Sequence, residues 1–269
     1  MNADGDGAVV LRSERELARQ RQAGAIQCAV LDALGAAIAP GVTTAELNAL
    51  AERLIREAGA IPTFKGYRGF PAAICASVND EVVHGIPGRR RLEAGDIVSC
   101  DVGVTLGGYI GDGARTYAVE PIDADARRLL AVTQASLEAG IAVARVGSRV
   151  GDIGHAVQSL VEAAGFSVVR DYCGHGVGTS MHEPPQVPNH GRPGRGPRLR
   201  AGMVVAIEPM VNAGGFRVRL DRNGWTVRTQ DGSRSAHFEH TVAIGPDGPR
   251  ILTAPLEAGA TGAGRLPDG

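Results

Sequence analysis

The chain has 269 residues and a mass of 27.8 kDa, which suits one large globular domain or two small ones. Basic and acidic residues nearly balance, 28 against 29, so no overall charge favours nucleic acid or an anionic membrane surface. Apolar residues make up 43% of the chain, but no apolar run approaches the roughly 20 residues that a membrane span needs. These features argue against a dedicated DNA-binding protein and against an integral membrane protein.

The predicted elements alternate between helices and strands along the chain. Apolar residues at three- and four-residue spacing predict helices at 13–39, 44–58, 123–144 and 149–164. Gly59 and Gly165 stand where the second and fourth helices should end. Residues 1–10 and 255–269 are rich in Gly, Ala and Asp, and we expect them to be disordered. Runs of β-branched or alternating residues predict strands at 72–78, 96–104, 108–119, 167–171, 203–211, 225–228 and 237–244.

An internal repeat organises these elements. Residues 40–60 align with 146–166 at an offset of 106, and GDIVSCDVGV (95–104) aligns with GMVVAIEPMV (202–211) at an offset of 107. The second alignment sets Asp101 opposite Glu208. We therefore predict an α+β fold in one catalytic domain, residues 11–254. Its two similar halves, about 11–120 and 121–254, would close around a central site.

Four acidic residues stand inside apolar strand-like runs. Asp101 and Asp112 flank a tight turn at residues 107–108, and the pairing this predicts makes them face each other or nearly so. Glu208 and Glu239 lie in the apolar runs MVVAIEPMV and AHFEHTVAI. Any one of these acids could be a paired core charge, but four unpaired buried carboxylates would be very costly. Two divalent ions would neutralise their combined charge of −4, so the sequence predicts a dinuclear metal site.

Three histidines stand near these acids in glycine- or proline-marked segments. His175, in CGHGVG, would add a nitrogen ligand, and a site so rich in oxygen favours Mn, Fe(II) or Co over a thiolate-type zinc site. His84 and His182 could flank a substrate and donate to it, although each alone is more often structural.

A cluster of arginines and the four cysteines bear on the surface of the protein and on its cellular compartment, not on a catalytic site. Arginines at 192, 195, 198 and 200 alternate with Gly and Pro, which predicts a mobile surface loop and leaves contact with RNA or the ribosome open. The chain has no signal-peptide pattern, and its four cysteines show neither C-x-x-C spacing nor the density of a disulfide scaffold. We expect a cytoplasmic protein. The cysteines are Cys28, Cys75, Cys100 and Cys173.

From about Val9 to Thr253 the chain resembles the type I methionine aminopeptidases, which have the pita-bread metallopeptidase fold with a central antiparallel sheet. The resemblance lies in the motifs NDEVVHGIP, GDIVSCDVGV with GYIGDGART, YCGHGVG, MHEPPQVPNHG, GMVVAIEPMVNAG and WTVRTQDGSRSAHFEHTVAI. The chain departs from the family pattern at three positions. Gly103 stands where a hydroxyl residue is frequent, Met181 where an aromatic residue is common, and His237 where glutamine is common. His237 would be either a donor to the metal ligands or a partly exposed structural residue.

The resemblance implies roles for specific residues. Two divalent ions (Co, Mn, Fe or Zn) would activate a water or hydroxide that attacks the first peptide carbonyl, with Glu208 handling its proton. His182 would stabilise the oxyanion, and His84 would contact the amide beyond the scissile bond. The implied metal ligands are Asp101, Asp112, His175, Glu208 and Glu239, of which Asp112 and Glu239 would bridge the ions. The implied methionine pocket is lined by Tyr67, Phe70, Cys75, Met181 and Trp225.

The expected activity is removal of the initiator methionine from nascent polypeptides whose second residue is small, by a monomer. One alternative is a proline-specific aminopeptidase of the same fold. We expect that class to carry a large domain ahead of the catalytic one, and only 83 residues precede His84. The other alternative is a non-catalytic peptide-binding homologue. We would expect it to have lost ligands, and all five are present.

Overall fold

The computed structural model describes residues 8–256. Most of the two end segments predicted to be disordered, residues 1–7 and 257–269, lies outside the described residues; residues 8–10 and 255–256 form no helix or strand. The helices are α1 (Glu14–Ala37), α2 (Thr44–Glu57), α3 (Ala124–Val143) and α4 (Val150–Ala163), with a short 3-10 turn at Tyr67–Gly69. None of the helices in residues 8–256 has the length and apolar character needed to cross a lipid bilayer.

All four predicted helices are present, and their ends follow from local side chains. Ser13 and Thr43 cap α1 and α2, and in each case a glutamate three residues later completes a capping box. Gly59 and Gly165 have positive φ values of 71° and 79° just beyond α2 and α4, as a left-handed helix stop requires.

The strands form four antiparallel sheets. In order across each sheet they are β1-β4-β2 with β5 paired to β4, then β13-β10-β6, β11-β12-β3 and β15-β14-β9-β7-β8. The strands predicted at 96–104 and 108–119 are confirmed as β4 and β5. Several other strands have only two to five residues, which is too short for alternating apolar and polar residues to be recognised in the sequence. The bounds are β1 Ile61–Pro62, β2 Cys75–Val78, β3 Glu81–Val83, β4 Ile97–Leu106, β5 Tyr109–Ala118, β6 Ser167–Val168, β7 Gly174–Gly176, β8 Glu183–Val187, β9 Val204–Ile207, β10 Met210–Asn212, β11 Val218–Leu220, β12 Val227–Thr229, β13 Ser235–His237, β14 His240–Gly245 and β15 Gly248–Ile251.

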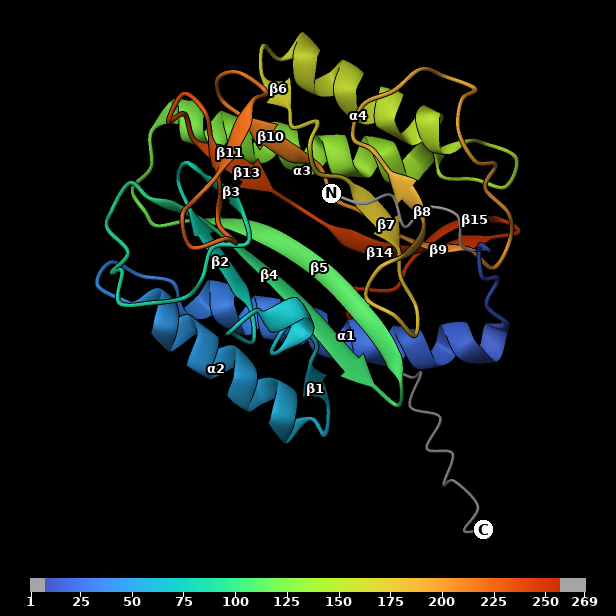
Figure 1. Ribbon diagram of the computed structural model, residues 1–269, viewed down its shortest axis with the longest axis horizontal. Coiled ribbons are helices and arrows are strands. Elements are labelled where there is room, and N and C mark those ends of the chain that lie inside the picture. The colour runs from blue at the N-terminus through green and yellow to red at the C-terminus, as the bar shows by residue number, and fades with distance from the viewer. Residues whose placement is uncertain (1–7, 257–269) are drawn as a thin grey trace.

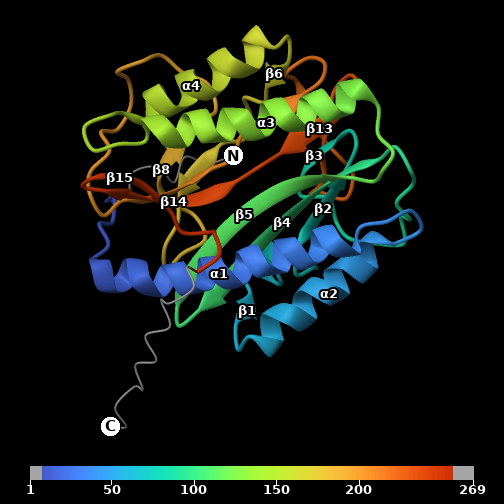
Figure 2. The same cartoon turned by 180° about the vertical axis from the view of Figure 1, so that it is seen from behind.

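Two similar halves enclose the middle of the molecule. In the first half α1 and α2 pack on β2 and β4, and in the second α3 and α4 pack on β9, β10 and β14. Figures 1 and 2 show the two helix pairs on opposite outer sides, with the strands between them. The bounds of α4 lie 106 residues after those of α2, as the internal repeat predicts.

A seam of hydrogen bonds joins the two halves beside the centre. The backbone N–H of Asp112, on β5, donates to the Thr241 hydroxyl at 3.0 Å, and that hydroxyl donates back to the Asp112 carbonyl at 2.8 Å. The Glu239 N–H donates to the Ala114 carbonyl at 2.9 Å. This seam fixes the acids of the second half against those of the first.

Candidate metal centre and substrate pocket

Asp101 and Asp112 lie on one face of the β4–β5 hairpin. The glycines at 107 and 108 have φ values of 55° and 83°, which a tight hairpin turn of this kind requires. The resulting register pairs Asp101 with Ala114 and Gly103 with Asp112. The two aspartates are therefore diagonal neighbours, two residues away from direct opposition, which agrees with the near-opposition expected from the sequence.

Glu208 and Glu239 lie at interruptions in the strands, which corrects the prediction of continuous strands at 203–211 and 237–244. Glu208 and Pro209 separate β9 from β10, and Phe238 and Glu239 separate β13 from β14. Proline has no N–H to donate to a neighbouring strand, so the sheet pairing breaks beside Glu208. Each break includes a glutamate that lines the central cavity.

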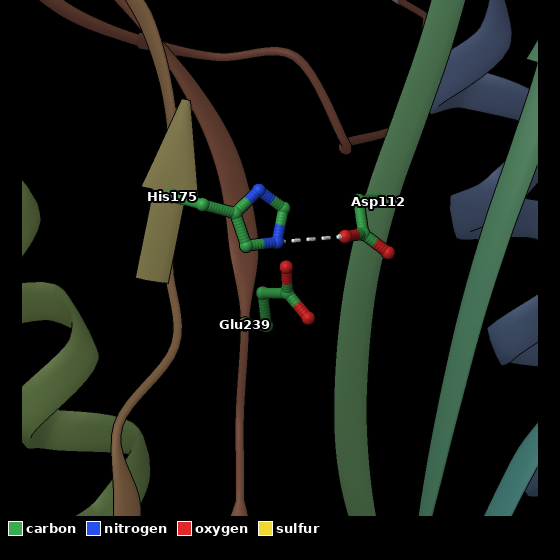
Figure 3. A group of neighbouring side chains, drawn as sticks. All are labelled: Asp112, His175 and Glu239. Carbon is green, nitrogen blue, oxygen red and sulfur yellow. Dashed lines mark ion pairs between the residues drawn. The ribbon is translucent and has the colours of Figure 1, made fainter. Parts of the chain in front are cut away.

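His175 comes from the three-residue strand β7, whose neighbours must be glycine. A Cβ on Gly174 or on Gly176 would lie only 2.3 Å from a backbone oxygen of an adjacent segment. The His175 Nδ1–H donates to the Gly176 carbonyl at 2.9 Å, which leaves Nε2 as the ligating nitrogen. Nε2 lies 3.6 Å from Asp112 Oδ2 and 3.5 Å from Glu208 Oε1, and Figure 3 shows the ring pointing at Asp112.

Asp112 and Glu239 are buried and Asp101 and Glu208 are half-buried, without a cation from the described part of the chain. No arginine or lysine nitrogen in residues 8–256 lies within 4.0 Å of them, and Asp101, Asp112 and Glu239 each have a buried oxygen without a hydrogen-bond partner. Burial raises the pKa of Asp112 to about 7, and burial with neighbouring carboxylates raises the pKa values of the other three well above normal. Burial also lowers the pKa of His175 to about 4, so its ring is neutral near pH 7.

This donor set fits divalent metal ions. Asp112, His175 and Glu239 each offer one atom within 4.8 Å of the others, and the remaining two acids line the same cavity. Unpartnered carboxylate oxygens at this depth are costly unless a cation neutralises them, and oxygen-rich sets suit hard or borderline divalent ions.

The metal-centre acids form the floor of a cavity of about 430 Å³. Every residue predicted from the sequence to ligate metal, to act in catalysis or to bind methionine lines it. The residues are Tyr67, Phe70, Cys75, His84, Asp101, Asp112, His175, Met181, His182, Glu208, Trp225 and Glu239.

The cavity wall also contains residues that the sequence analysis missed. Tyr172 and Cys173 are the first two residues of the YCGHGVG motif, so their position beside His175 in the chain was an available signal. Phe64 and Arg68 flank the predicted pocket residue Tyr67, but nothing in their own pattern indicated that they face the cavity.

His182 is oriented by Tyr67. The Tyr67 hydroxyl lies 2.8 Å from His182 Nδ1, and the two rings stack with centroids 5.5 Å apart. The His182 ring is also close to that of His175, with centroids 4.2 Å apart. Burial, with His175 as a second cause, lowers the pKa of His182 to about 3.

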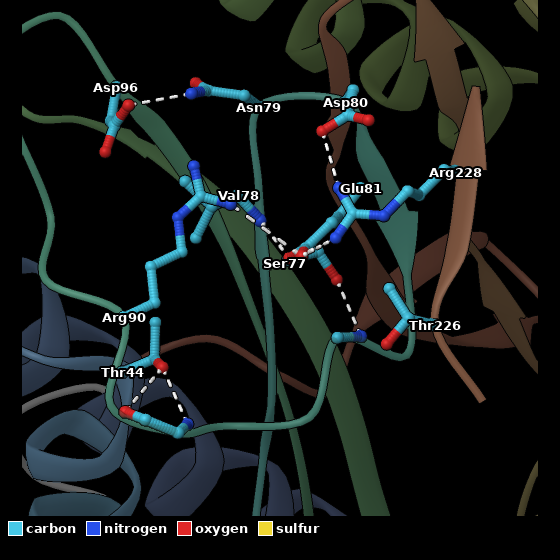
Figure 4. Close-up of polar contacts among 12 residues, drawn as sticks. Thr44, Ser77, Val78, Asn79, Asp80, Glu81, Arg90, Asp96, Thr226 and Arg228 are labelled. Carbon is cyan, nitrogen blue, oxygen red and sulfur yellow. Dashed lines mark hydrogen bonds and ion pairs between the residues drawn. The ribbon is translucent and has the colours of Figure 1, made fainter. Parts of the chain in front are cut away.

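His84 follows β3 in a left-handed backbone conformation, with a φ of 59° that is strained for a non-glycine residue. The N–H of the next residue, Gly85, donates to the Ser77 hydroxyl at 3.1 Å, a contact drawn in Figure 4. Tyr172 and Trp225 meet the His84 ring edge-on, with centroids 5.7 and 6.3 Å away. Burial lowers the pKa of His84 to about 4.

Two departures from the family pattern have structural explanations. A Cβ on Gly103 would lie 2.6 Å from the Phe64 ring, so the missing side chain makes room for that ring. His237 is buried, which rules out a partly exposed residue. Its Nε2 lies 3.8 Å from one oxygen each of Glu208 and Glu239. Met181 lines the cavity, as an aromatic residue there would.

The sequence and fold match those of known metallopeptidases. Residues 18–246 match the model of metallopeptidase family M24. The chain belongs to this family. A methionine aminopeptidase of Clostridium acetobutylicum is 53% identical over 91% of this chain and 98% of its own length. Methionine aminopeptidase 1 of Bacillus subtilis is 52% identical over 91% of this chain and 99% of its own length.

Solved structures confirm the pita-bread fold of this M24 protein. The crystal structure of methionine aminopeptidase from Rickettsia prowazekii matches with a TM-score of 0.91 and 43% identity, covering 92% of this chain and all of that one. A prolidase from Pyrococcus furiosus matches with a TM-score of 0.73 and 21% identity, covering 92% of this chain and 66% of that one. The second likeness shows the shared fold alone.

Proposed function

We propose that this M24 protein is a methionine aminopeptidase, which hydrolyses the first peptide bond of polypeptides that begin with methionine. The observation that carries the proposal is one cavity in which carboxylates without an arginine or lysine partner among residues 8–256 meet an apolar wall. Relatives of that name, about half identical over nearly their whole length, support it. The proline-specific alternative is not favoured, because the prolidase structures share only the fold.

Asp101, Asp112, His175, Glu208 and Glu239 would hold two divalent ions, with Asp112 and Glu239 shared between them. When bound, such ions make a water molecule acidic and polarise a carbonyl oxygen. The donor chemistry admits Co, Mn, Fe or Zn. Glu208 would accept the proton of the attacking water, because its carboxylate lines the cavity beside His175 and its raised pKa suits a base that must later release a proton.

The methionine side chain would enter the apolar end of the cavity. Phe70 and Trp225 pack edge to face there, with centroids 5.1 Å apart, beside Cys75 and Met181. A thioether gains from contacts with aromatic rings and bends to fill an irregular apolar space. Tyr67 would close the remaining side of this pocket.

His182 and His84 would act as neutral residues. Their lowered pKa values keep both rings uncharged near pH 7. When the Tyr67 hydroxyl donates to His182 Nδ1, the ring carries its hydrogen on Nε2 and can donate to the developing oxyanion. His84 would contact the amide on the other side of the scissile bond.

The preference for a small second residue would be steric. That side chain would press against the wall near His84, whose ring is packed between Tyr172 and Trp225 and has little room to move. The substrates would be the N-termini of nascent polypeptides, and we propose that the enzyme works as a cytoplasmic monomer.

Purified protein loaded with Mn or Co provides the test. We expect release of methionine from Met-Ala-Ser and no cleavage of Ala-Pro-Ala, measured by chromatography of the products. Met-Leu-Ser should be cleaved more slowly than Met-Ala-Ser because of the steric wall. Cleavage of Ala-Pro-Ala alone would instead favour a proline-specific enzyme, and no cleavage of any peptide would favour a binding protein.

A further inference from the structure

The turn between β7 and β8 carries two residues of the cavity wall, Met181 and His182. The side chain of Glu183, the first residue of β8, closes this turn on itself. Its Oε1 accepts hydrogen bonds from the backbone N–H groups of Thr179, at 2.9 Å, and Ser180, at 3.0 Å. The position of His182 therefore depends on how the neighbouring carboxylate is held.

Arg12, which lies just before α1 and 171 residues away from Glu183 in sequence, holds that carboxylate. Its Nη2 donates to both Glu183 oxygens, at 2.7 and 2.8 Å, and the two side chains are only 7% and 12% exposed. The Arg12 backbone N–H donates to the Gly202 carbonyl at 2.7 Å, which fixes the segment to the second half.

The turn is shaped to fit this guanidinium. Gly178, at the start of the turn, has no side chain, and a Cβ there would lie 2.2 Å from Arg12 Nη2. The arginine thus packs directly against the backbone of the turn as well as pairing with its carboxylate.

We propose that Arg12 is a positioning residue for this reaction: through Glu183 it fixes the turn that presents His182 and Met181 to the substrate. The proposal rests on the proposed function, which gives His182 and Met181 their roles. Without Arg12 the Glu183 carboxylate would be a nearly buried charge with no cation, and the turn would rearrange to hydrate it. A displacement of about 1 Å at a group that stabilises a transition state can cost about 100-fold in rate.

Steady-state kinetics on Met-Ala-Ser test the proposal. We expect Arg12→Leu to lower kcat about 100-fold and to raise KM, while the metal content stays at the wild-type level. Arg12→Lys should recover most of kcat, because only one nitrogen of Arg12 contacts Glu183 and an ammonium can replace it. Wild-type kcat in Arg12→Leu would overturn the proposal.

A matched control is the ion pair between β15 and the first residue of α1. Arg250 pairs with Glu14 of α1 at 2.8 Å, a contact as short as that of Arg12, but both side chains are well exposed and neither lines the cavity. Arg250→Leu should leave kcat and KM within twofold of wild type. A loss as large as that of Arg12→Leu would mean that anchoring α1, rather than the turn, matters.

A double variant tests whether the unpaired charge of Glu183 causes the effect of Arg12→Leu. Glu183→Gln keeps an oxygen for the Thr179 and Ser180 N–H groups but carries no charge, so Arg12→Leu with Glu183→Gln should be more stable and more active than Arg12→Leu alone. This comparison remains decisive if Arg12→Leu does not fold. A double variant as impaired as the single one would overturn the role of Glu183 as intermediary.

A readout independent of catalysis keeps this proposal distinct from the proposed function. Nitrogen NMR of ¹⁵N-histidine-labelled protein, with the His182 signals assigned from His182→Asn, should show those signals displaced in Arg12→Leu and not in Arg250→Leu. Unchanged His182 signals would refute the positioning role even in an active enzyme. Displaced signals in a protein that cleaves no methionine peptide would refute the proposed function and leave the Arg12–Glu183 coupling intact.

Discussion

Two clusters of buried or half-buried acids in this molecule are neutralised in different ways. In one, the Arg228 guanidinium contacts Asp80, Glu81 and Asp221, each through a different nitrogen, at distances of 2.6–2.7 Å. Figure 4 shows the contacts with Asp80 and Glu81. In the other, the carboxylates around His175 have no arginine or lysine of residues 8–256 within 4.0 Å. Figure 3 shows two of these carboxylates, Asp112 and Glu239, beside His175.

The pKa values follow this difference. The Arg228 hydrogen bond lowers the pKa of Asp221, whereas burial raises the pKa of Asp101 well above normal. Glu81 is the most buried acid of the first cluster, and its pKa is raised by burial despite Arg228. The chain thus supplies its own cation where acids hold strands together. Where residues 8–256 supply none, the acids suit ions that come from solution.

Removing one acid from each cluster should affect activity very differently. We expect Asp112→Asn to lower kcat/KM at least about 1000-fold, or about 4 kcal/mol of barrier, because the proposed function makes Asp112 a ligand of both ions and the amide would be a poor substitute. Asp80→Asn is the matched control and should retain activity within a few-fold. Peptide kinetics and metal titration by calorimetry measure both effects. Near-normal turnover by Asp112→Asn would contradict a two-ion centre.

Removing the arginine tests the other side of the comparison. Arg228→Met would remove the guanidinium that joins Asp80, Glu81 and Asp221, leaving Arg219 beside Asp221 at 2.9 Å and Arg90 near Glu81 at 3.8 Å. We expect a loss of about 2 kcal/mol in the free energy of unfolding, less than for a fully buried pair because these side chains are 12–26% exposed. Urea denaturation measures it, and added Mn should not restore the loss. An unchanged unfolding free energy would show that the cluster contributes nothing to stability.

The affinity for metal should depend on pH through the carboxylates around His175, which have no arginine or lysine partner among residues 8–256. Because their pKa values are raised, to about 7 for Asp112, these groups hold protons at neutral pH that metal binding must displace. Affinity should therefore fall as the pH drops below 7, up to about tenfold per pH unit for each proton released. His175 contributes no proton above pH 5, since its pKa is about 4. Calorimetry in buffers of different ionisation enthalpy counts the protons, and a pH-independent affinity would contradict the raised values.

The sequence predicted the metal-centre acids better than it predicted the backbone around them. Asp101 and Glu208 were recognisable because a charge in an apolar run is unusual, and the capped, periodic helices were recognisable from local residues. The breaks at Glu208 and Glu239 were not, since a bend of two residues leaves no periodic pattern. The contact of Arg12 with Glu183 joins residues 171 apart, and no local pattern indicates such a pairing.

The smallest expected effect is a change in the free energy of unfolding when one acid of each cluster is neutralised. In metal-free protein, kept so with a chelator, Asp101→Asn should raise the free energy of unfolding by about 1 kcal/mol, because it removes one of four buried carboxylates that repel one another. Asp221→Asn should do the opposite, because the hydrogen bond from Arg228, at 2.6 Å, lowers the pKa of Asp221, so the charge of this carboxylate stabilises the folded protein. Urea denaturation of both variants measures the sign. If Asp101→Asn destabilises the metal-free protein as Asp221→Asn does, the acids of the centre are stabilised by protein contacts and need no metal ion to neutralise them.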